Sequence, residues 1–249
     1  MSGHSRWAGI KHKKGLADVK RGKLFTKLIR EITVAAREGG GVPEHNPRLR
    51  KAMEDSRAAN MPADNIQKAI ARGTGELPGV TYEEITYEGY GPGGVAVLVE
   101  VTTDNKNRTT AEIRKIFAQH AGGLGEAGCV AWMFQKKGYI SIEKGKVPED
   151  KLMALALEAG ADDFQSEDDF YEIVTAPADF DKVKNELGKA GIPSLSASVT
   201  LLPQTYVPVA SPQAEQVLQL IDELEDHDDV REVYSNFDIP QEVMNRVRR

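Results

Sequence analysis

The apolar positions follow a helical period in the first third of the chain. Over residues 18–39, apolar side chains recur three or four residues apart, which is typical of an amphipathic helix, and a run of glycines ends the pattern. Two shorter segments, 47–60 and 60–73, each carry one apolar stripe, and Pro47 suits a first helical position. Because each predicted helix has only one apolar face, we expect the three to pack together as a small bundle over residues 18–74.

A linker rich in glycine and proline at residues 73–84 ends this pattern, and strands then alternate with helices. The run "GGVAVLVEVTT" is typical of a buried strand, and "CVAWMF" at 129–134 is predicted to be another. Residues 139–204 have the order strand, helix, strand, strand, helix, strand, which is the ferredoxin-like arrangement. The strand–helix–strand segments on either side, 94–134 and 205–239, are expected to pair with each other.

The predicted fold class is therefore α+β with three domains, a helical bundle followed by two ferredoxin-like α/β domains, one inserted in the other. Residues 1–80 would form the basic arm and the three-helix bundle. Residues 81–134 and 206–249 would form a discontinuous middle domain, and residues 135–205 the inserted domain. Three domains in simple series remain the alternative.

Charge divides the chain into two parts. Residues 1–80 contain 16 Lys and Arg and 8 Asp and Glu, whereas residues 81–249 contain 16 and 30, within a formal net charge of −6. Ten of the cations lie between Arg6 and Arg37, where Asp18 and Glu31 are the only acids. Such a separation of charge along the chain bears on which partners a protein binds, and it does not predict the fold.

The basic N-terminal segment favours nucleic acid as the partner, because Lys and Arg neutralise phosphates and release the condensed counterions. Residues 1–17 have no period and several glycines, which predicts a mobile arm, and Trp7 offers a ring for stacking on a base. The candidate contact residues are the cations, imidazoles and indole of the arm and of the polar face of the first helix: His4, Arg6, Trp7, Lys11, His12, Lys13, Lys14, Lys20, Arg21, Lys23, Lys27 and Arg30.

Two other interpretations of these charges stay open. The cations are ordinary solvated side chains of a surface helix, or the basic segment pairs with the acidic domains of the same protein. Further cations of the bundle, such as Arg48, would widen a nucleic-acid surface, although each by itself is more simply a solvated side chain.

The sequence gives little support for catalysis or for a bound metal. The pattern G-x-G-x-x-G at 123–128 follows a helix instead of a strand, so it is not a dinucleotide fingerprint. The five histidines lack metal-ligand spacing, and Cys129 is the single cysteine, which excludes an intrachain disulfide. The acidic runs 162–169 and 222–229 lack the spacing of a calcium loop and are expected to be solvated. We therefore expect no catalytic residues, no metal and no small-molecule cofactor.

No apolar run approaches the ~20 residues needed to cross a bilayer, and the first residues lack the apolar core of a secretory signal. With a single cysteine, the simplest expectation is a cytoplasmic protein without a membrane partner.

Several blocks of the sequence resemble the YebC family. They occur in order, and they include "GHSRWAGIKHKK", "RGKLFTKLIREI", "NMPADNI", "YEGYGPGGVA", "DNKNRT" and "GGLGEAGCVAWMF". The likeness covers nearly the whole chain and is strongest in residues 1–140. The family usually has Asn where this chain has Gly9 and often has Lys where it has Arg6, and neither difference removes positive charge.

The resemblance implies three domains around an open cleft, with the middle domain interrupted, and a cytoplasmic protein that binds nucleic acid. Members include bacterial proteins called probable transcriptional regulators and a mitochondrial translational activator. The family has no settled catalytic residues, and its N-terminal signature falls here on Gly3, His4, Ser5, Trp7, Lys11, His12, Lys13 and Lys14.

The expected function is a non-enzymatic nucleic-acid-binding regulator of gene expression, and a DNA-binding transcriptional regulator in particular. A translation factor that binds ribosomal RNA or the ribosome is the alternative. Two further alternatives are a metal-dependent enzyme acting on nucleic acid, with Mg²⁺ held by Asp162, Asp163, Glu167 and Asp168, and an assembly factor whose arm docks on acidic proteins.

Overall fold

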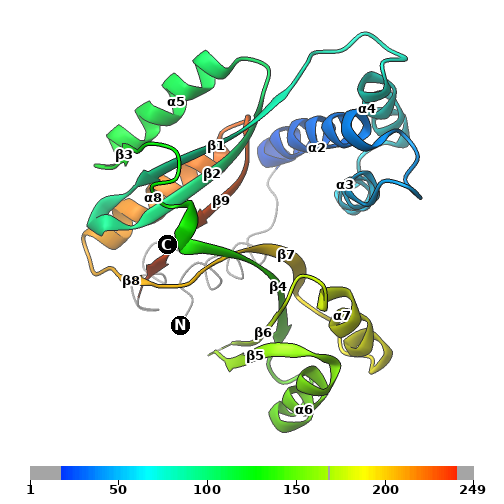
Figure 1. Cartoon of the computed structure of the whole chain (residues 1–249), viewed down its shortest axis with the longest axis vertical. Coiled ribbons are helices and arrows are strands. Elements are labelled where there is room, and N and C mark those ends of the chain that lie inside the picture. Colours follow the sequence, from blue (N-terminus) through cyan, green and yellow to red (C-terminus); the bar gives the residue numbers. More distant parts are fainter. Residues whose placement is uncertain (1–17, 168, 240–249) are drawn as a thin grey trace. The chain divides into compact units, whose positions relative to one another are not determined.

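The computed structural model describes residues 18–167 and 169–239 (Figure 1), so the predicted mobile arm lies outside the described residues. Two compact units make up this part of the chain. One comprises residues 18–129 and 212–233, and the other comprises residues 130–211, apart from residue 168, together with residues 234–239. The elements confirm the α+β class, and three domains are consistent with them. The domain boundaries stay a prediction.

The three predicted helices of the bundle are confirmed as α2 (Asp18–Gly39), α3 (Pro47–Ala58) and α4 (Ala63–Thr74). Their core is built from one apolar face of each helix: Ile32, Ala35, Ala36, Leu49, Ala52, Met53, Ile66 and Ala69, together with Met61 between α3 and α4. Asn46 begins α3, because its side-chain oxygen accepts from the Leu49 amide at 3.0 Å, while its Nδ2 donates to the Ala35 carbonyl at 2.7 Å. One side chain therefore joins the start of α3 to the end of α2.

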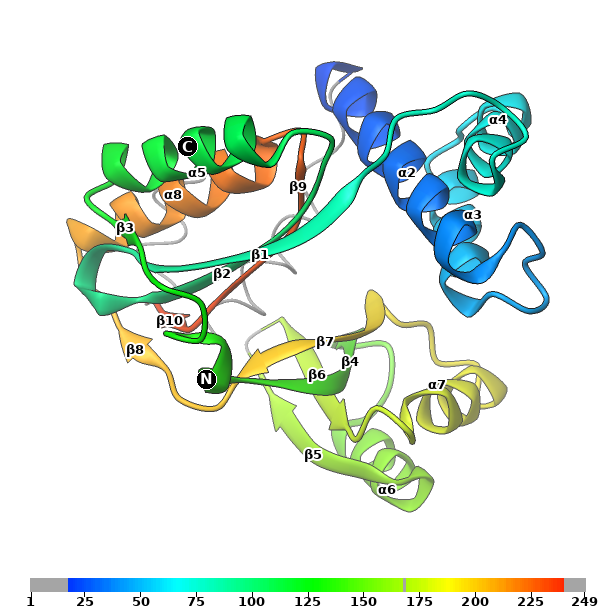
Figure 2. The same cartoon turned by 45° about the horizontal axis from the view of Figure 1, so that its top comes forward.

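The same unit contains a sheet of four strands in the order β3-β1-β2-β9. The strands are β1 (Glu83–Tyr90), β2 (Ala96–Thr103), β3 (Gly123–Leu124) and β9 (Val230–Ser235). The short 3-10 helix η1 (Pro92–Gly94) joins β1 to its antiparallel neighbour β2. Helices α5 (Lys106–Gln119) and α8 (Gln213–Asp226) lie side by side along one face of the sheet (Figure 2). A strand from the C-terminal part of the chain thus enters the sheet beside β2.

The prediction of a strand at residues 129–134 is wrong, because a 3-10 helix, η2 (Ala131–Met133), occupies this segment. Val130 and Phe134 are buried, whereas the side chain of Trp132 between them is 68% exposed. A strand would place these three side chains on one face, so the turn that exposes Trp132 is incompatible with it. The predicted strand at 205–209 is shorter than expected: β8 (Val207–Pro208) pairs in parallel with β10 (Phe237–Asp238) in a separate two-stranded sheet.

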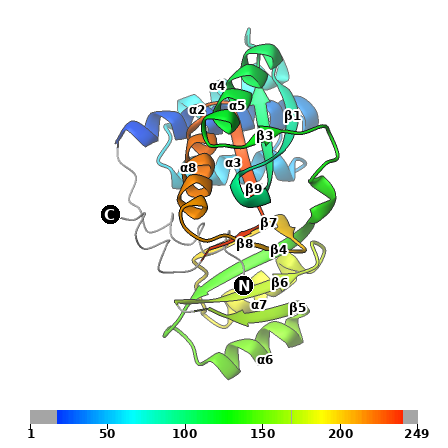
Figure 3. The same cartoon turned by 90° about the vertical axis from the view of Figure 1, so that its left-hand side faces the viewer.

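The second unit contains the predicted ferredoxin-like arrangement, which is confirmed. Its elements in chain order are β4 (Phe134–Glu143), α6 (Glu149–Ala159), β5 (Ala161–Ser166), β6 (Phe170–Thr175), α7 (Phe180–Lys189) and β7 (Ser196–Pro203). The sheet order is β5-β6-β4-β7, and all neighbours are antiparallel (Figure 3). Strand β4 begins five residues earlier than the sequence predicts.

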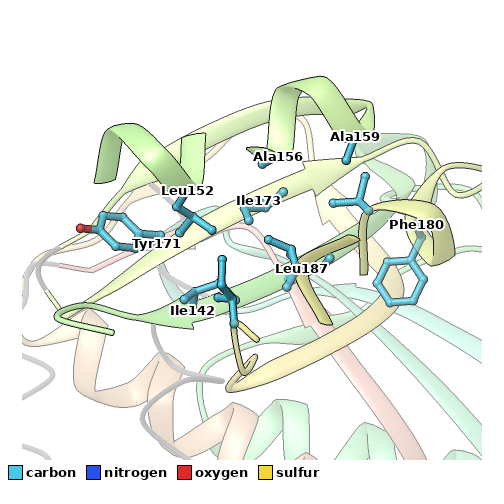
Figure 4. Close-up of a cluster of buried hydrophobic side chains, with 11 residues drawn as sticks. Ile142, Leu152, Ala156, Ala159, Tyr171, Ile173, Phe180 and Leu187 are labelled. Atoms are coloured by element: carbon cyan, nitrogen blue, oxygen red, sulfur yellow. The ribbon is translucent and has the colours of Figure 1, made fainter. Parts of the chain in front are cut away.

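Both helices of this unit pack on one face of its sheet (Figure 4). The core combines side chains from the central strands with one face of α6 and one of α7: Ile140, Ile142, Tyr171, Ile173, Leu152, Ala156, Ala159, Phe180, Val183 and Leu187. Gly138 on β4 allows the approach of α7, since a Cβ there would lie 2.8 Å from a ring carbon of Phe180.

None of the helices in the described ranges has a stretch long and apolar enough to span a bilayer.

Leu152→Ala should lower the free energy of unfolding by about 2–5 kcal/mol, because it removes a fully buried side chain and leaves a cavity. Leu157 lies on the same helix with half of its surface exposed, so Leu157→Ala is the matched control and should change stability by less than about 0.5 kcal/mol. Urea unfolding measures both variants. Equal destabilisation by the two substitutions would contradict the packing of α6 on its sheet through Leu152.

Candidate nucleic-acid interface

The structure describes only part of the predicted interface. Seven candidates, namely His4, Arg6, Trp7, Lys11, His12, Lys13 and Lys14, lie outside the described residues. Lys20 and Arg21 belong to the first turns of α2. The side chains of Lys23, Lys27 and Arg30 are described, and they show what the basic face of α2 contacts.

These three cations all meet the C-terminal end of α8. Lys23 Nζ donates to the Asp226 carbonyl at 3.0 Å, and Lys27 Nζ donates to the Glu225 carbonyl at 2.5 Å. Arg30 Nη1 donates to the Asp228 carbonyl at 2.6 Å. The three residues are spaced four and three apart, so they form one strip along α2.

The contact has a clear physical cause in the end of α8. The last carbonyls of a helix lack partners within the helix and carry partial negative charge, which cations stabilise. Helix α8 has no basic residue in its own last turn. Helix α2 supplies the missing donors. For Lys23, Lys27 and Arg30, the structure therefore agrees with the interpretation that the basic segment pairs with the acidic part of the same protein.

Asp229, just beyond α8, is the most heavily bonded group of this contact. Its side chain is only 3% exposed, and Arg30 Nη1 donates to its Oδ1 at 2.6 Å. Its Oδ2 accepts from Arg108 Nη2 at 2.8 Å and from the hydroxyls of Thr109 at 2.5 Å and Thr103 at 3.0 Å. Burial alone would raise the pKa of Asp229, but these hydrogen bonds and the charge of Arg30 outweigh it and lower the pKa to about 2.

Among the described residues, Glu112, His227 and Asp229 bring their possible ligand atoms within 4.8 Å of one another. The geometry fits an ion-pair network better than a metal centre. Both oxygens of Asp229 already accept from guanidinium groups. His227 Nδ1 accepts from the Asp229 amide at 3.1 Å, and its Nε2 lies 3.0 Å from Glu112 Oε2, so the imidazole bridges α8 and α5.

A second ionic network joins the bundle to the sheet of β1, β2 and β9. Arg48 on α3 forms paired hydrogen bonds with Glu31 on α2, at 2.7 and 3.0 Å, and with Glu84 on β1, at 2.7 and 3.0 Å. Arg231 on β9 bridges Glu84 at 3.1 Å and Glu100 at 2.6 Å. The hydrogen bonds from Arg48 lower the pKa of Glu84. Arg48 is thus engaged within the protein and does not widen a cationic surface.

The acidic residues of the enzyme alternative do not converge in the described structure. Asp162 is exposed and pairs with Lys137 at 2.8 Å. Asp163 is also exposed and accepts from the Phe164 amide and the Gln165 side chain, whereas Glu167 is buried. Asp168 lies outside the described residues. The described members therefore lack the shared orientation that a Mg²⁺ site needs.

The glycine loops have a structural explanation. The 3-10 turn η1 confirms the predicted turn between β1 and β2. A Cβ on Gly89 would lie 2.5 Å from the Gly123 carbonyl oxygen, and one on Gly122 would lie 2.7 Å from the Tyr90 carbonyl oxygen. Glycine at these positions lets β3 lie directly against β1.

Asp229→Asn should remove a pH-dependent part of the stability. The folded-state pKa of about 2 lies below the ordinary value of 3.8, so this contribution is present above about pH 4 and is lost as the pH falls toward 2. The variant should be less stable at pH 7 by about 2 kcal/mol, and the difference from the wild type should shrink below about pH 4. Denaturant unfolding at a series of pH values measures this difference in the free energy of unfolding. Asp162→Asn, at an exposed carboxylate, is the control. A difference that stays constant with pH would refute the role of this carboxylate.

Arg48→Lys should lower the free energy of unfolding by about 1–3 kcal/mol, because an ammonium cannot reproduce the paired geometry with Glu31 and Glu84. Arg50 is exposed on the same helix, so Arg50→Lys is the matched control and should change little. Thermal unfolding of the two variants compares them. If both behave like the wild type, the paired contacts do not hold the bundle in place.

Comparison with known proteins gives consistent matches along the chain. The family model described as "TACO1/YebC protein N-terminal domain" matches residues 5–76, and the model "TACO1/YebC second and third domain" matches residues 82–237. A protein of Dictyoglomus turgidum is 61% identical over 245 residues, which are 98% of each chain. A protein of Elusimicrobium minutum is 56% identical over 250 residues and spans both chains in full. Both are named "Probable transcriptional regulatory protein".

A solved structure agrees with these relatives. The crystal structure of a conserved hypothetical protein, Aq1575, from Aquifex aeolicus superposes with a TM-score of 0.84 at 49% sequence identity, and the match covers 96% of this chain and 99% of that one. With both domain models and full-length relatives in agreement, the chain belongs to the TACO1/YebC family.

Proposed function

We propose that the protein is a non-enzymatic regulator of gene expression that binds nucleic acid through its basic N-terminal segment, with DNA-binding transcriptional regulation as the leading form. The observation that carries the proposal is the segregation of charge, with 16 Lys and Arg against 8 Asp and Glu in residues 1–80 and the reverse excess beyond. The names of the relatives agree with a regulator. The cytoplasmic location and the absence of an enzymatic activity stay predictions.

The contacts of α2 divide the candidate residues into two groups. Lys27 and Arg30 are engaged at the end of α8, in the neighbourhood of Asp226 and Asp228. Carboxylates in that segment would repel a phosphate backbone. Lys23 also donates to the Asp226 carbonyl there. We therefore place the phosphate contacts on the cations of residues 6–21.

The bundle supports contacts to the backbone of nucleic acid more than readout of its bases. Direct readout needs free donors and acceptors that reach base edges. On the exposed side of α4, Lys68 Nζ pairs with Asp64 at 2.6 Å, so these two groups satisfy each other. Phosphate contacts set affinity and orientation without reading sequence. Residues 81–249, with their acidic excess, would turn away from the polyanion and leave their surface to proteins.

A translation factor that binds ribosomal RNA or the ribosome is the second candidate, and one observation favours it. Trp7 stands between cations in "GHSRWAGIKHKK". An aromatic ring beside guanidinium and ammonium groups suits unpaired bases, which folded RNA presents more often than duplex DNA. Crosslinking in cells followed by sequencing separates the two, because promoter DNA and ribosomal RNA give different products.

Replacing Lys11, Lys13 and Lys14 together by Ala should weaken binding and reduce its salt dependence. The slope of log K against log salt should fall by about 0.7–0.9 for each phosphate that the variant no longer neutralises. Fluorescence anisotropy with duplex DNA and with uridine homopolymer RNA measures the slope.

The matched control replaces three exposed lysines of the unit that contains residues 130–211, namely Lys146, Lys151 and Lys189, by Ala, which removes the same charge at a distant place in the sequence. Its slope should equal that of the wild type. Equal slopes for both triple variants would remove the arm lysines from the interface.

A further inference from the structure

Strand β7 forms one edge of the sheet in the second unit, because the order β5-β6-β4-β7 gives it a single neighbour among the described strands (Figure 2). Its register with β4 is continuous from Ser196 to Pro203, without a bulge. An antiparallel strand directs half of its backbone N–H and C=O groups to each side. The outward half of these groups in β7 is therefore available to a further strand.

The other sheet edges in the described part of the chain carry features that hinder such pairing. Strand β5, at the opposite edge of the same sheet, contains the exposed Asp162 and Asp163, and its register shifts at this point. In the sheet of the first unit, β3 has only two residues, and β9 contains Arg231 and Glu232. Both strands of the small sheet, β8 and β10, also have two residues. Short strands, bulges and charges are the usual means by which proteins protect an edge.

Strand β7 has none of these features. It is eight residues long, its one proline is the last residue, and its sequence "SASVTLLP" contains no charge. No Asp, Glu, His, Lys or Arg occurs from residue 190 to residue 214, although 28% of the residues in the chain are charged. Val199 near the middle of the strand is 38% exposed, and Leu195 just before it is 40% exposed. A long neutral edge with exposed aliphatic side chains favours the addition of another strand.

We propose that β7 pairs with β7 of a second copy of the same chain, in antiparallel orientation around a two-fold axis at Val199. The sheets of the two copies then join into one continuous sheet. Closed two-fold pairing is the commonest way in which identical chains associate. This assignment goes beyond the proposed function and does not depend on it.

The absence of charge favours a second copy as the occupant of this edge. A strand that pairs with itself sets a residue on the axis opposite the same residue, so a charge there would face a like charge. Around Val199 the pairs are Val199 with Val199, Ser198 with Thr200, and Ala197 with Leu201, and all of them are neutral.

The terminal segments of the chain itself are poorer candidates for the same edge. Residues 1–17 and 240–249 both have a positive excess in the sequence. Strand β7 offers no carboxylate that would select either of them. A partner protein with a charged strand meets the same objection.

Sedimentation velocity of the full chain over a wide range of concentration tests the pairing. A single pair of strands is a small interface, so the dimer should be weak and its population should rise with concentration. Val199→Lys sets like charges opposite each other on the axis and should weaken association by about tenfold or more. Gln165→Lys adds the same charge at an exposed position of β5 and should associate like the wild type.

A mixture of two variants separates lost pairing from damaged folding. Val199→Asp should associate as poorly as Val199→Lys when each is alone, because both set like charges on the axis. Equal amounts of the two should associate again, because the charges on the axis are then opposite. In the wild type, amide hydrogen exchange in β7 should slow as the concentration rises, and exchange in β5 should not change.

A wild-type protein that stays monomeric at every concentration would overturn the assignment. So would a wild-type dimer that Val199→Lys leaves intact, or folded variants that fail to associate when they are mixed. If the variants do not fold, the exchange of β7 in the wild type decides, and exchange that is independent of concentration would refute the pairing. Nucleic-acid binding enters none of these measurements, so their failure leaves the proposed function standing.

Discussion

The arrangement of the first unit depends on one buried carboxylate. Asp229 is almost removed from water, and a charge in that position is tolerated only when its oxygens are fully bonded. Its partners come from α2 and, more than seventy residues later in the sequence, from the end of β2 and the start of α5. The Thr102 amide also donates to the Asp229 carbonyl, at 2.8 Å. Satisfying one side chain therefore fixes α2 and α5 relative to the sheet.

The second network acts with the first. A glycine-rich connection between α4 and β1 gives the bundle no fixed orientation by itself. Arg48 and Arg231 between them contact four glutamates, which come from α2, β1 and β2. Because the planar guanidinium of Arg48 is held in two forks, the contact specifies direction as well as distance. Ionic contacts thus supply the orientation that the apolar core of the bundle cannot, since that core lies among its own three helices.

Local pattern predicted most of the elements and few of the contacts. The period of α2, Pro47 at the start of α3 and the element order from β4 to β7 depend on neighbouring residues, and the sequence displays them. The strand prediction for residues 129–134 was wrong because Val130, Trp132 and Phe134 alternate in the sequence as apolar residues do in a strand. In the structure only Val130 and Phe134 are buried. Asp229 looks like its acidic neighbours in "DELEDHDD", and the carbonyls that hold Lys23 and Lys27 are backbone groups without a sequence signature.

The same contacts bear on which half of α2 belongs to the proposed nucleic-acid interface. Between Lys23 and Arg30 the helix lies against a segment that carries Glu225, Asp226, Asp228 and Asp229. With four acidic residues in that segment, the three cations leave little net field to attract phosphates, and the attraction that remains acts over about one Debye length. Residues before Lys23 have no such acids in the sequence apart from Asp18. The anchored part of α2 begins at Lys23, and the cations proposed to contact nucleic acid precede it in the sequence. Self-pairing and nucleic-acid binding can therefore share one helix without competing for the same side chains.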